Sequence, residues 1–518
     1  MRLNLLTDPL LRVEADHGLK SLSLPGLLAG LGENNVNSIL GLQRYQEDSF
    51  LIFIGYLGSA ALLRADRTDP IQTEAFWHDS LLNLSGGLKE AWCLVVDDAT
   101  KPAFMQPPVA NAEIAKSYKA KALTPDAIDI LPTAKNHDVK SNRAESAEPE
   151  DWIYALVNLQ TTAGFFGQGN YGIARMNGGF GSRPCIDLRY ADSWGEVWQE
   201  AISRLLDLCS ELLAGSWGYQ PDGTVLTWLH SWDGKSSLSL SELNPLFIEI
   251  CRAIRLVQRK EGIEATAMPT KAPRIAAKQL KGLLGDPWIP INSKKGSALT
   301  VSATGFTPGL LRDLLFEDGF ELQSMQRPLP NLQAEHCRLH ASVLVRGQGT
   351  TDGFHETNIP IPSRIAKPLF QTGPERDRLG ELSKTGISDA GAMQNRVLRP
   401  ALYSLLEGGP VTVDFNKREV SAWLNSATKG FADAWSSDFF PWLWRGLDQP
   451  DNELACLSWR RKLMKHGLAS FKDSAARLPD RSGRHYRSRV RAESVFFGAM
   501  YKLFPELRER NHEQQSNN

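Results

Sequence analysis

The chain has 518 residues, 42% of them hydrophobic and 23% charged, and a formal net charge of −1. This composition excludes a mainly disordered chain, and the length favours roughly two to four compact units rather than one. No apolar run approaches the ~20 residues of a membrane span, and acidic residues near the start argue against a signal peptide, so we expect a cytoplasmic protein with no membrane partner.

Because the net charge is so small, any affinity for nucleic acid would have to come from a local concentration of basic residues. The six cysteines lie far apart, and none forms the C-x-x-C spacing of a zinc or redox site. We therefore expect reduced, mostly buried thiols, no metal and no cofactor.

The N-terminal part alternates between strand and helix signals. Residues 4–28 predict a β-hairpin that turns at residues 16–18 and is followed by a short helix. Residues 50–61 have apolar side chains at helical spacing, which favours a buried helix. Residues 74–96 predict another helix and then a strand.

Residues 133–151 are polar and without apolar periodicity, which predicts a long mobile loop that can order on a partner. Asn136, His137 and Asp138 resemble pieces of a nuclease site, but general acid/base chemistry needs a metal or nucleophile that the sequence does not show. The first half of the loop is basic through Lys135, His137, Lys140 and Arg143.

Residues 164–184, GFFGQGNYGIARMNGGFGSRP, contain seven glycines, four aromatic residues and two arginines, and no Asp or Glu lies between Asp151 and Asp187. Glycine at this density suits sharp turns and close approach of the backbone to a ligand. Exposed backbone N–H groups, arginines and aromatic rings together suit a polyanion such as nucleic acid. The alternative is a glycine-rich hairpin with a few core aromatics.

Residues 193–213 predict an amphipathic helix, and residues 238–257 predict a second helix capped by Ser241 with Asn244. That second helix would carry Arg252 and Arg255 one turn apart. The following residues 270–292 are basic up to Asp286, and either a basic patch or an ordinary solvated face fits them.

Residues 334–362 predict strands joined by a tight turn in which glycines bracket Gln348. A glutamine on such a tip could act on a ligand, or the tip could be an ordinary surface hairpin end.

After Pro362 helical periodicity dominates. Four segments, residues 376–407, 416–444, 451–476 and 486–507, have the lengths of an antiparallel four-helix bundle. We therefore predict an α+β protein with a large mixed α/β domain over residues 1–368, a bundle over residues 369–510 and a disordered tail over residues 511–518.

The bundle sequence also holds the strongest local charge. Eleven Lys or Arg and only two Asp lie in residues 459–491, a local excess of nine positive charges. Arg484, Arg487 and Arg491 are spaced three and four residues apart, so a helix starting near His485 places the last two on one face. This face could contact DNA phosphates, or it could be a solvated face or a subunit contact.

Taken together, several stretches resemble CasA, the large subunit of the type I-E CRISPR surveillance complex called Cascade. The resemblance runs in order along nearly the whole chain and ends in the helical third. The matching pieces are NLLTDPLLRV, EAWCLVVDDATKPAFMQPPV, KNHDVK, GNYGIARMNGGFGSRP, LHSWDG with ELNPLFIEICR, and VRGQGTTDGFHE.

The resemblance implies a non-catalytic protein that reads the short PAM (protospacer-adjacent motif) on double-stranded DNA, largely from the minor groove, and helps to open the duplex. Its implied partners are that DNA, the 5′ end of the guide RNA, the other Cascade subunits and a helicase-nuclease recruited in trans.

The resemblance also implies site residues. The family's glycine loop falls on residues 164–169, its lysine finger on Lys278 or Lys281, its glutamine wedge on Gln348 or a neighbour, and its guide-RNA or subunit loop on Lys135, Asn136, His137 and Lys140. With the basic helix added, the expected DNA-binding residues are Gly164, Phe166, Gly167, Gln168, Gly169, Asn170, Arg175, Lys278, Lys281, Gln348, Arg484, Arg487 and Arg491.

Two other classes of protein stay open at this point. One is an RNA-processing or nucleotide-hydrolysing enzyme that uses the KNHD loop, although the sequence has no Walker A motif, metal-ligand cluster or nucleophile elbow to support it. The other is a scaffold that does not contact DNA, which predicts no salt-sensitive binding to duplexes.

Overall fold

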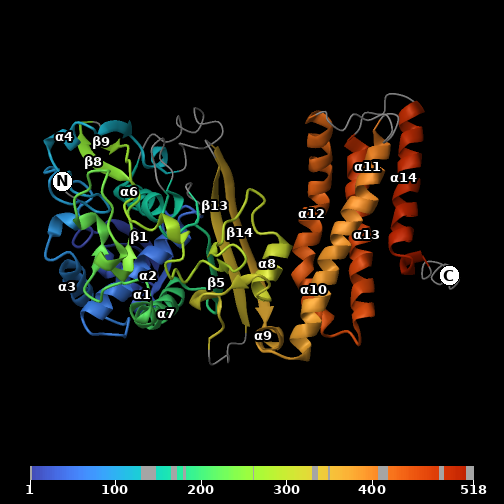
Figure 1. The fold of residues 1–518 in the computed structure, drawn as a ribbon, viewed down its shortest axis with the longest axis horizontal. Coiled ribbons are helices and arrows are strands. Elements are labelled where there is room, and N and C mark those ends of the chain that lie inside the picture. The colour runs from blue at the N-terminus through green and yellow to red at the C-terminus, as the bar shows by residue number, and fades with distance from the viewer. Residues whose placement is uncertain are drawn as a thin grey trace. The chain divides into compact units, whose positions relative to one another are not determined.

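The computed structural model describes residues 3–129, 147–164, 172–178, 183–260, 262–329, 336–347, 350–406, 418–477 and 483–508. The chain forms two compact units. The first comprises Met1–Phe306 and Glu317–Pro362, and the second comprises Thr307–Phe316 and Ser363–Asn518. The first unit mixes helices with small sheets and the second is helical (Figure 1), which confirms the predicted α+β class.

The N-terminal hairpin forms as predicted. Strands β1 (Leu11–Ala15) and β2 (Gly18–Leu22) pair antiparallel, and Gly18 takes the positive φ of +103° that the turn requires. The Ser23 side chain then accepts a hydrogen bond from the Gly26 backbone N–H and caps helix α1 (Leu24–Gly32).

Between its charged ends, helix α2 (Glu47–Arg64) is apolar on all sides because it lies inside the first unit. It packs against α3 (Glu74–Leu84) and α7 (Trp194–Ala214). A Cβ on Gly58 would lie 2.9 Å from Trp198, so glycine allows α2 and α7 to approach closely. The Trp198 indole N–H donates to the Ile54 carbonyl at 3.1 Å, which satisfies it inside the core.

Small sheets complete the first unit. The antiparallel strands β8 (Ala253–Arg259) and β9 (Gly262–Met268) continue into β4 (Lys119–Ala122), and the long hairpin β13 (His336–Gly347) and β14 (Thr350–Pro362) is joined by β5 (Cys185–Arg189). The shorter strands are β3 (Val36–Ile39), β6 (Thr224–Leu226), β7 (Leu243–Ile248), β10 (Ile291–Asn292), β11 (Ser297–Ala298) and β12 (Phe320–Glu321). The short helices are η1 (Lys89–Trp92), α4 (Ala112–Ala115), η2 (Pro125–Ala127), α6 (Pro149–Asn158), η5 (Thr227–Leu229), η6 (Leu240–Glu242), η7 (Lys278–Leu280) and η8 (Ser324–Gln326).

The helix predicted over residues 238–257 is wrong. The chain instead forms the short turn η6, capped by Ser239, and then the strands β7 and β8. All six residues of β7 are buried, so a strand with two covered faces shows no alternation and imitates a core helix in sequence. The strand predicted in residues 74–96 is also wrong, since only an isolated bridge from Cys93 to Asn4 follows η1.

In the second unit the four predicted helical segments are confirmed. The first is continuous from α10 (Pro374–Ala392) through the π-helix η9 (Met393–Leu398) to α11 (Arg399–Leu405), and the others are α12 (Arg418–Gly446), α13 (Asn452–Arg477) and α14 (Gly483–Leu503). They form a bundle whose core includes Trp442 stacked on Trp459 at 4.6 Å between ring centroids. Two shorter helices, α8 (Pro308–Leu315) and α9 (Ser363–Phe370), also belong to this unit.

All six cysteines are free and buried, as the sequence predicts. Within the described ranges, no helix combines the length and the apolar character needed to cross a bilayer.

Candidate nucleic-acid interface

The structure describes only some of the residues expected to bind nucleic acid. Gly164, Arg175, Lys278, Lys281, Arg487 and Arg491 are described fully, and Arg484 only by its backbone in the first turn of α14. Outside the described residues lie Phe166, Gly167, Gln168, Gly169, Asn170, Gln348, Lys135, Asn136, His137 and Lys140.

The glycine-rich segment starts from a π-helix. Helix α6 continues as η4 (Leu159–Ala163), and Gly164 ends it with a left-handed φ of +64°. The buried Gln160 amide is held on both sides: its oxygen accepts from the N–H groups of Cys251 and Arg252 at 2.9 and 2.8 Å, and its nitrogen donates to the carbonyls of Met105 and Arg252 at 2.9 and 3.0 Å. Single π turns are rare and often occur at functional sites, and here four hydrogen bonds fix the starting point of the segment.

The far end of the same segment returns to this starting point. The Arg183 backbone N–H donates to the Thr162 carbonyl at 3.4 Å, and the Arg183 guanidinium donates to the Thr161 carbonyl at 3.4 Å and pairs with the buried Asp286 carboxylate. Arg183 is therefore tied to Thr161 and Thr162, the residues just before Ala163 and Gly164 at the start of the segment.

Arg175, within the described part of this segment, is buried, and its side chain is only 3% exposed. Its guanidinium stacks on Phe247 at 3.7 Å from the ring centroid, donates to the Pro245 carbonyl at 3.3 Å and lies 3.8 Å from the Glu249 carboxylate. Burial lowers the pKa of Arg175, but the neighbouring Tyr56 and Glu249 outweigh it, so the pKa is raised overall and the group stays charged. In this packing the Arg175 guanidinium does not reach solvent, and its contacts are all within the first unit.

The turn that carries Lys278 and Lys281 packs on the residues that follow the glycine loop. Both lysines are exposed, Lys278 at the start of η7 and Lys281 just after it with a left-handed φ of +52°. Gly282 follows with φ +84°, and a Cβ there would lie 2.6 Å from Ala298 and 2.8 Å from the backbone of Met176. The structure thus brings two sequence-distant predicted DNA elements together, and glycine permits the contact.

The hairpin whose tip includes Gln348 is firmly held at its stem. Strands β13 and β14 pair over their whole described length, with a register shift between Val345 and Arg346 opposite Gly353. Arg346 is 4% exposed and donates to the Asp129 carbonyl at 2.8 Å. Asp129 directly precedes the segment that includes Lys135, Asn136, His137 and Lys140.

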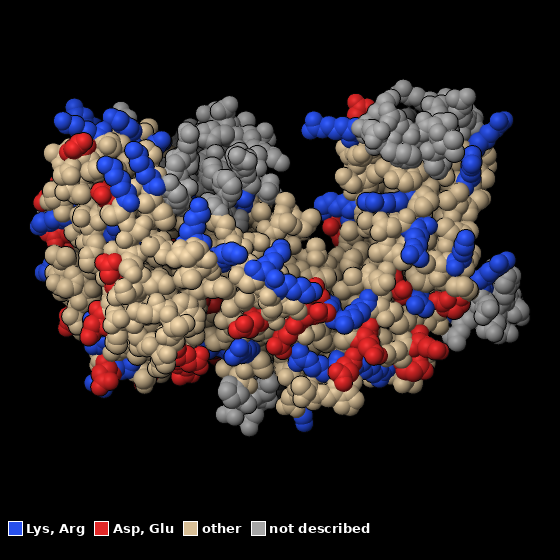
Figure 2. All heavy atoms as spheres, in the orientation of Figure 1, with Lys and Arg blue, Asp and Glu red and all other residues tan. Residues whose placement is uncertain are grey.

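In the bundle, the basic residues fall into two groups. Arg460, Lys462 and Arg477 are paired with carboxylates of Asp389, Asp438 and Asp473. Arg487 and Arg491 are exposed on α14 and have no ion-pair partner among the described residues. Helix α14 starts at Gly483, two residues earlier than expected, so Arg484 belongs to its first turn. Figure 2 shows Lys and Arg spread along the visible face of the helical unit, while most of the Asp and Glu visible on that face gather toward one end.

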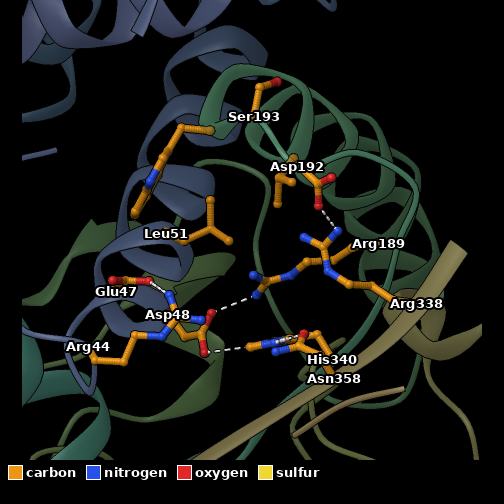
Figure 3. Close-up of a pocket in the computed structure, with 12 residues that line it drawn as sticks. Arg44, Glu47, Asp48, Leu51, Arg189, Asp192, Ser193, Arg338, His340 and Asn358 are labelled. Carbon is orange, nitrogen blue, oxygen red and sulfur yellow. Dashed lines mark hydrogen bonds and ion pairs between the residues drawn. The ribbon is translucent and has the colours of Figure 1, made fainter. Parts of the chain in front are cut away.

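A polar pocket of about 300 Å³ in the first unit, shown in Figure 3, was not expected from the sequence. Its residues come from α2, β5, α7 and the β13–β14 hairpin, and no local pattern links them. Asp48 has two cationic neighbours, Arg189 at 2.6 Å and His340 at 2.8 Å. The other two arginines of the pocket are also paired, Arg338 with Asp192 and Arg44 with both Glu47 and Glu356. Because each cation already has a carboxylate, this pocket has the character of a structural ion-pair network rather than a polyanion site.

Asp48 is the centre of that network. Burial raises its pKa, but His340 and Arg189 outweigh burial and hold the pKa well below the ordinary aspartate value. Burial likewise lowers the pKa of His340, and Asp48 outweighs it, so that pKa is raised. Among the described residues, no group of three or more His, Cys, Asp or Glu is arranged to hold a metal ion.

Comparison with known proteins places this architecture in one structural class: a mixed α/β unit that precedes a helical bundle. No protein-family model and no curated protein matches the sequence. Solved structures do match. CasA (Cse1) of Thermus thermophilus is 14% identical with a TM-score of 0.60, covering 97% of this chain and 99% of that one.

Two further matches agree. Cse1 of Acidimicrobium ferrooxidans is 15% identical with a TM-score of 0.56, covering 98% of this chain and 99% of that one. A chain of a CRISPR RNA-guided surveillance complex is 14% identical with a TM-score of 0.57, covering 96% and 99%. The chain thus has the Cse1/CasA fold over nearly its whole length, which confirms for the fold the resemblance seen in the sequence.

Proposed function

We propose that this chain is the large, non-catalytic subunit of a type I-E CRISPR RNA-guided surveillance complex that acts in the cytoplasm in antiviral defence. It recognises the PAM on double-stranded DNA, helps to open the duplex, and provides the docking platform for a helicase-nuclease recruited in trans. The observation that carries the proposal is the packing of the Lys278–Lys281 turn on the flank of the glycine-rich segment, within a Cse1/CasA fold.

The chemistry of these two elements suits the minor groove of DNA. That groove offers a degenerate pattern of acceptors, so a loop poor in side chains with one or two inserted lysines can accept several short sequences. Exposed Lys278 and Lys281 supply the charge, while buried Arg175 and Arg183 hold the base of the segment. Lysines on a fixed base lose less conformational freedom on binding than lysines on a free loop.

Two other elements complete the proposal. Gln348, at the tip of the β13–β14 hairpin, acts as the wedge that separates the pair beside the PAM, at an unstacking cost of a few kcal/mol per step. Lys135, Asn136, His137 and Lys140 contact the 5′ end of the guide RNA or a neighbouring Cascade subunit. Guide pairing supplies the sequence specificity that the protein does not read itself.

The glycine loop gives the sharpest test. Gly167→Asp or Gly169→Asp in the assembled complex adds a Cβ and a negative charge that would face the phosphates, and we expect PAM-dependent duplex binding to be lost while assembly is unchanged. Gly430→Asp is the matched control, because Gly430 is exposed on α12 and has open space around it. Equal target affinity for the Gly167 variant and the parent complex would refute the proposal.

The enzyme alternative is tested separately. If the isolated chain cleaved RNA or DNA with added divalent metal, and His137→Ala abolished the cleavage, the KNHD loop would be a catalytic site instead.

A further inference from the structure

Asp129 is the centre of a buried polar cluster that joins four separate parts of the first unit. Its carboxylate accepts hydrogen bonds from the Tyr45 hydroxyl at 3.0 Å, the Gln46 side-chain amide at 2.8 Å and the Asn158 side-chain amide at 2.6 Å. The Arg346 guanidinium donates to the Asp129 carbonyl at 2.8 Å and lies 3.6 Å from its carboxylate. Asp129 and Asn158 are 0% exposed and Arg346 is 4% exposed.

The members of this cluster stand at the bases of the segments proposed to bind nucleic acid. Asp129 precedes residues 130–146, Asn158 ends α6 where the π-helix leads to Gly164, and Arg346 lies two residues before Gln348. Tyr45 and Gln46 precede helix α2, the buried helix of the unit. One carboxylate therefore connects three stems that are far apart in sequence to the core.

A carboxylate suits this position. The four side chains that converge on Asp129 all present donors, and an ionised aspartate accepts without donating. Burial raises the pKa of Asp129, and Arg346 together with the hydrogen bonds from Gln46, Asn158 and Tyr45 opposes the rise. An amide of the same shape would place its NH₂ group against a donor.

We propose that Asp129 and Arg346 form a positioning pair that holds the end of β13 in register with α6, so that duplex opening by Gln348 depends on the pair and PAM encounter does not. The inference rests on the proposed function of Gln348. Because both residues are buried, neither can touch the DNA, and the role of the pair is to position other residues.

The test uses the assembled complex with guide RNA. Asp129→Asn and Arg346→Gln should each slow strand opening beside the PAM, followed by a fluorescent base analogue, by about tenfold, with initial PAM affinity within about twofold of the parent. The double variant should open no more slowly than the slower single variant, because residues that act as one unit are not additive. Additive slowing in the double variant would overturn the pairing.

Asp48→Asn is the matched control for a general loss of stability of the first unit. Asp48 is also an aspartate with little exposure, its side chain being 13% exposed, and it joins α2 to β13 through His340 and Ser342. A complex that carries Asp48→Asn should open DNA at the same rate as the parent complex. If Asp48→Asn slows opening as much as Asp129→Asn, the effect is general destabilisation and the inference is wrong.

A second measurement does not depend on DNA. In the isolated full chain, Asp129→Asn should increase amide hydrogen exchange in both α6 and the end of β13, and Asp48→Asn should not increase it in α6. Increased exchange in only one of the two elements would overturn the inference whatever the complex does. If the parent complex shows no PAM-dependent binding, the proposed function fails, while the exchange result still decides whether the pair links the two stems.

Discussion

Two groups of arginines, one in the core of the first unit and one on α14 of the second, have opposite surroundings. In the first unit, arginines such as Arg175, Arg183 and Arg346 are buried, each within reach of a carboxylate, and their guanidinium groups fix the bases of loops. On α14 of the second unit, Arg487 and Arg491 are exposed, and the described residues give them no acidic partner. The surroundings of an arginine, which its sequence neighbours do not reveal, thus decide whether its charge is already compensated within the protein.

Substitution of Arg183 is the most direct test of this difference. Arg183→Met leaves Asp286 as a buried charge without its main partner, and we expect the free energy of unfolding of the first unit to fall by about 3–5 kcal/mol. The counterpart Arg487→Gln on the bundle should change the free energy of unfolding by at most about 0.5 kcal/mol. Denaturant titration of the full chain measures both, and similar losses in the two variants would contradict the division into buried and exposed arginines.

A smaller loss of stability is expected where the turn of Lys278 and Lys281 packs on Met176. Gly282→Ala introduces a Cβ 2.8 Å from the backbone of Met176 at a φ of +84°, so the turn must shift. We expect a loss of about 1–3 kcal/mol of unfolding free energy and weaker PAM-dependent binding. Gly296→Ala, also at positive φ but with open space around it, controls for backbone strain alone. The packing would be unimportant if both variants behaved alike.

The ion pair of Asp48 with His340 adds a dependence on pH. The pKa of His340 is raised above its ordinary value of 6.5, so its stabilising effect is complete below pH 6.5 and is lost as the pH rises through the raised pKa. The pKa of Asp48 is lowered below 3.8, so its effect is complete above pH 3.8 and is lost as the pH falls through the lowered pKa. Thermal unfolding between pH 6 and 9 should therefore show a decline that His340→Gln removes, and an unchanged profile in that variant would disprove the assignment.

The smallest effect on stability belongs to the exposed group. Replacing Arg484, Arg487 and Arg491 by Gln should leave the unfolding temperature nearly unchanged. If these residues contact phosphates, the slope of log affinity against log salt should fall by ~0.9 per lost contact on duplex or ~0.7 on single strand, equally for all sequences. A parent-like salt slope would show that this face does not bind DNA.

Sequence predicted best what depends on local periodicity. The buried helix α2, the capped helix α7 and the four long helical segments of the second unit have patterns that a single stretch reveals. Prediction from sequence failed for β7, because a strand covered on both faces shows no alternation of apolar and polar residues. Pro245 within the strand was not enough to exclude a helix.

Local sequence patterns predicted even less of the candidate nucleic-acid interface. Composition indicated a ligand-binding segment at residues 164–184, but it could not tell that Arg175 is buried, because that burial is decided by Tyr56 and Phe247 from distant elements. The Asp129 cluster has no sequence signal at all. Arg346 lies 217 positions from Asp129, and only folding brings the two together.

Helix α8 has a consequence for how this protein can be divided. It lies in sequence between two stretches of the first unit, yet it belongs to the second, where the Arg312 guanidinium donates to the Ser383 hydroxyl at 3.1 Å and Leu311, Leu314 and Leu315 are buried. A gene fragment that begins at Ser363 would therefore produce a bundle without this cover and with apolar side chains newly open to water. Any attempt to excise the bundle, or to exchange it between relatives as a module, has to carry residues 307–316 along with it.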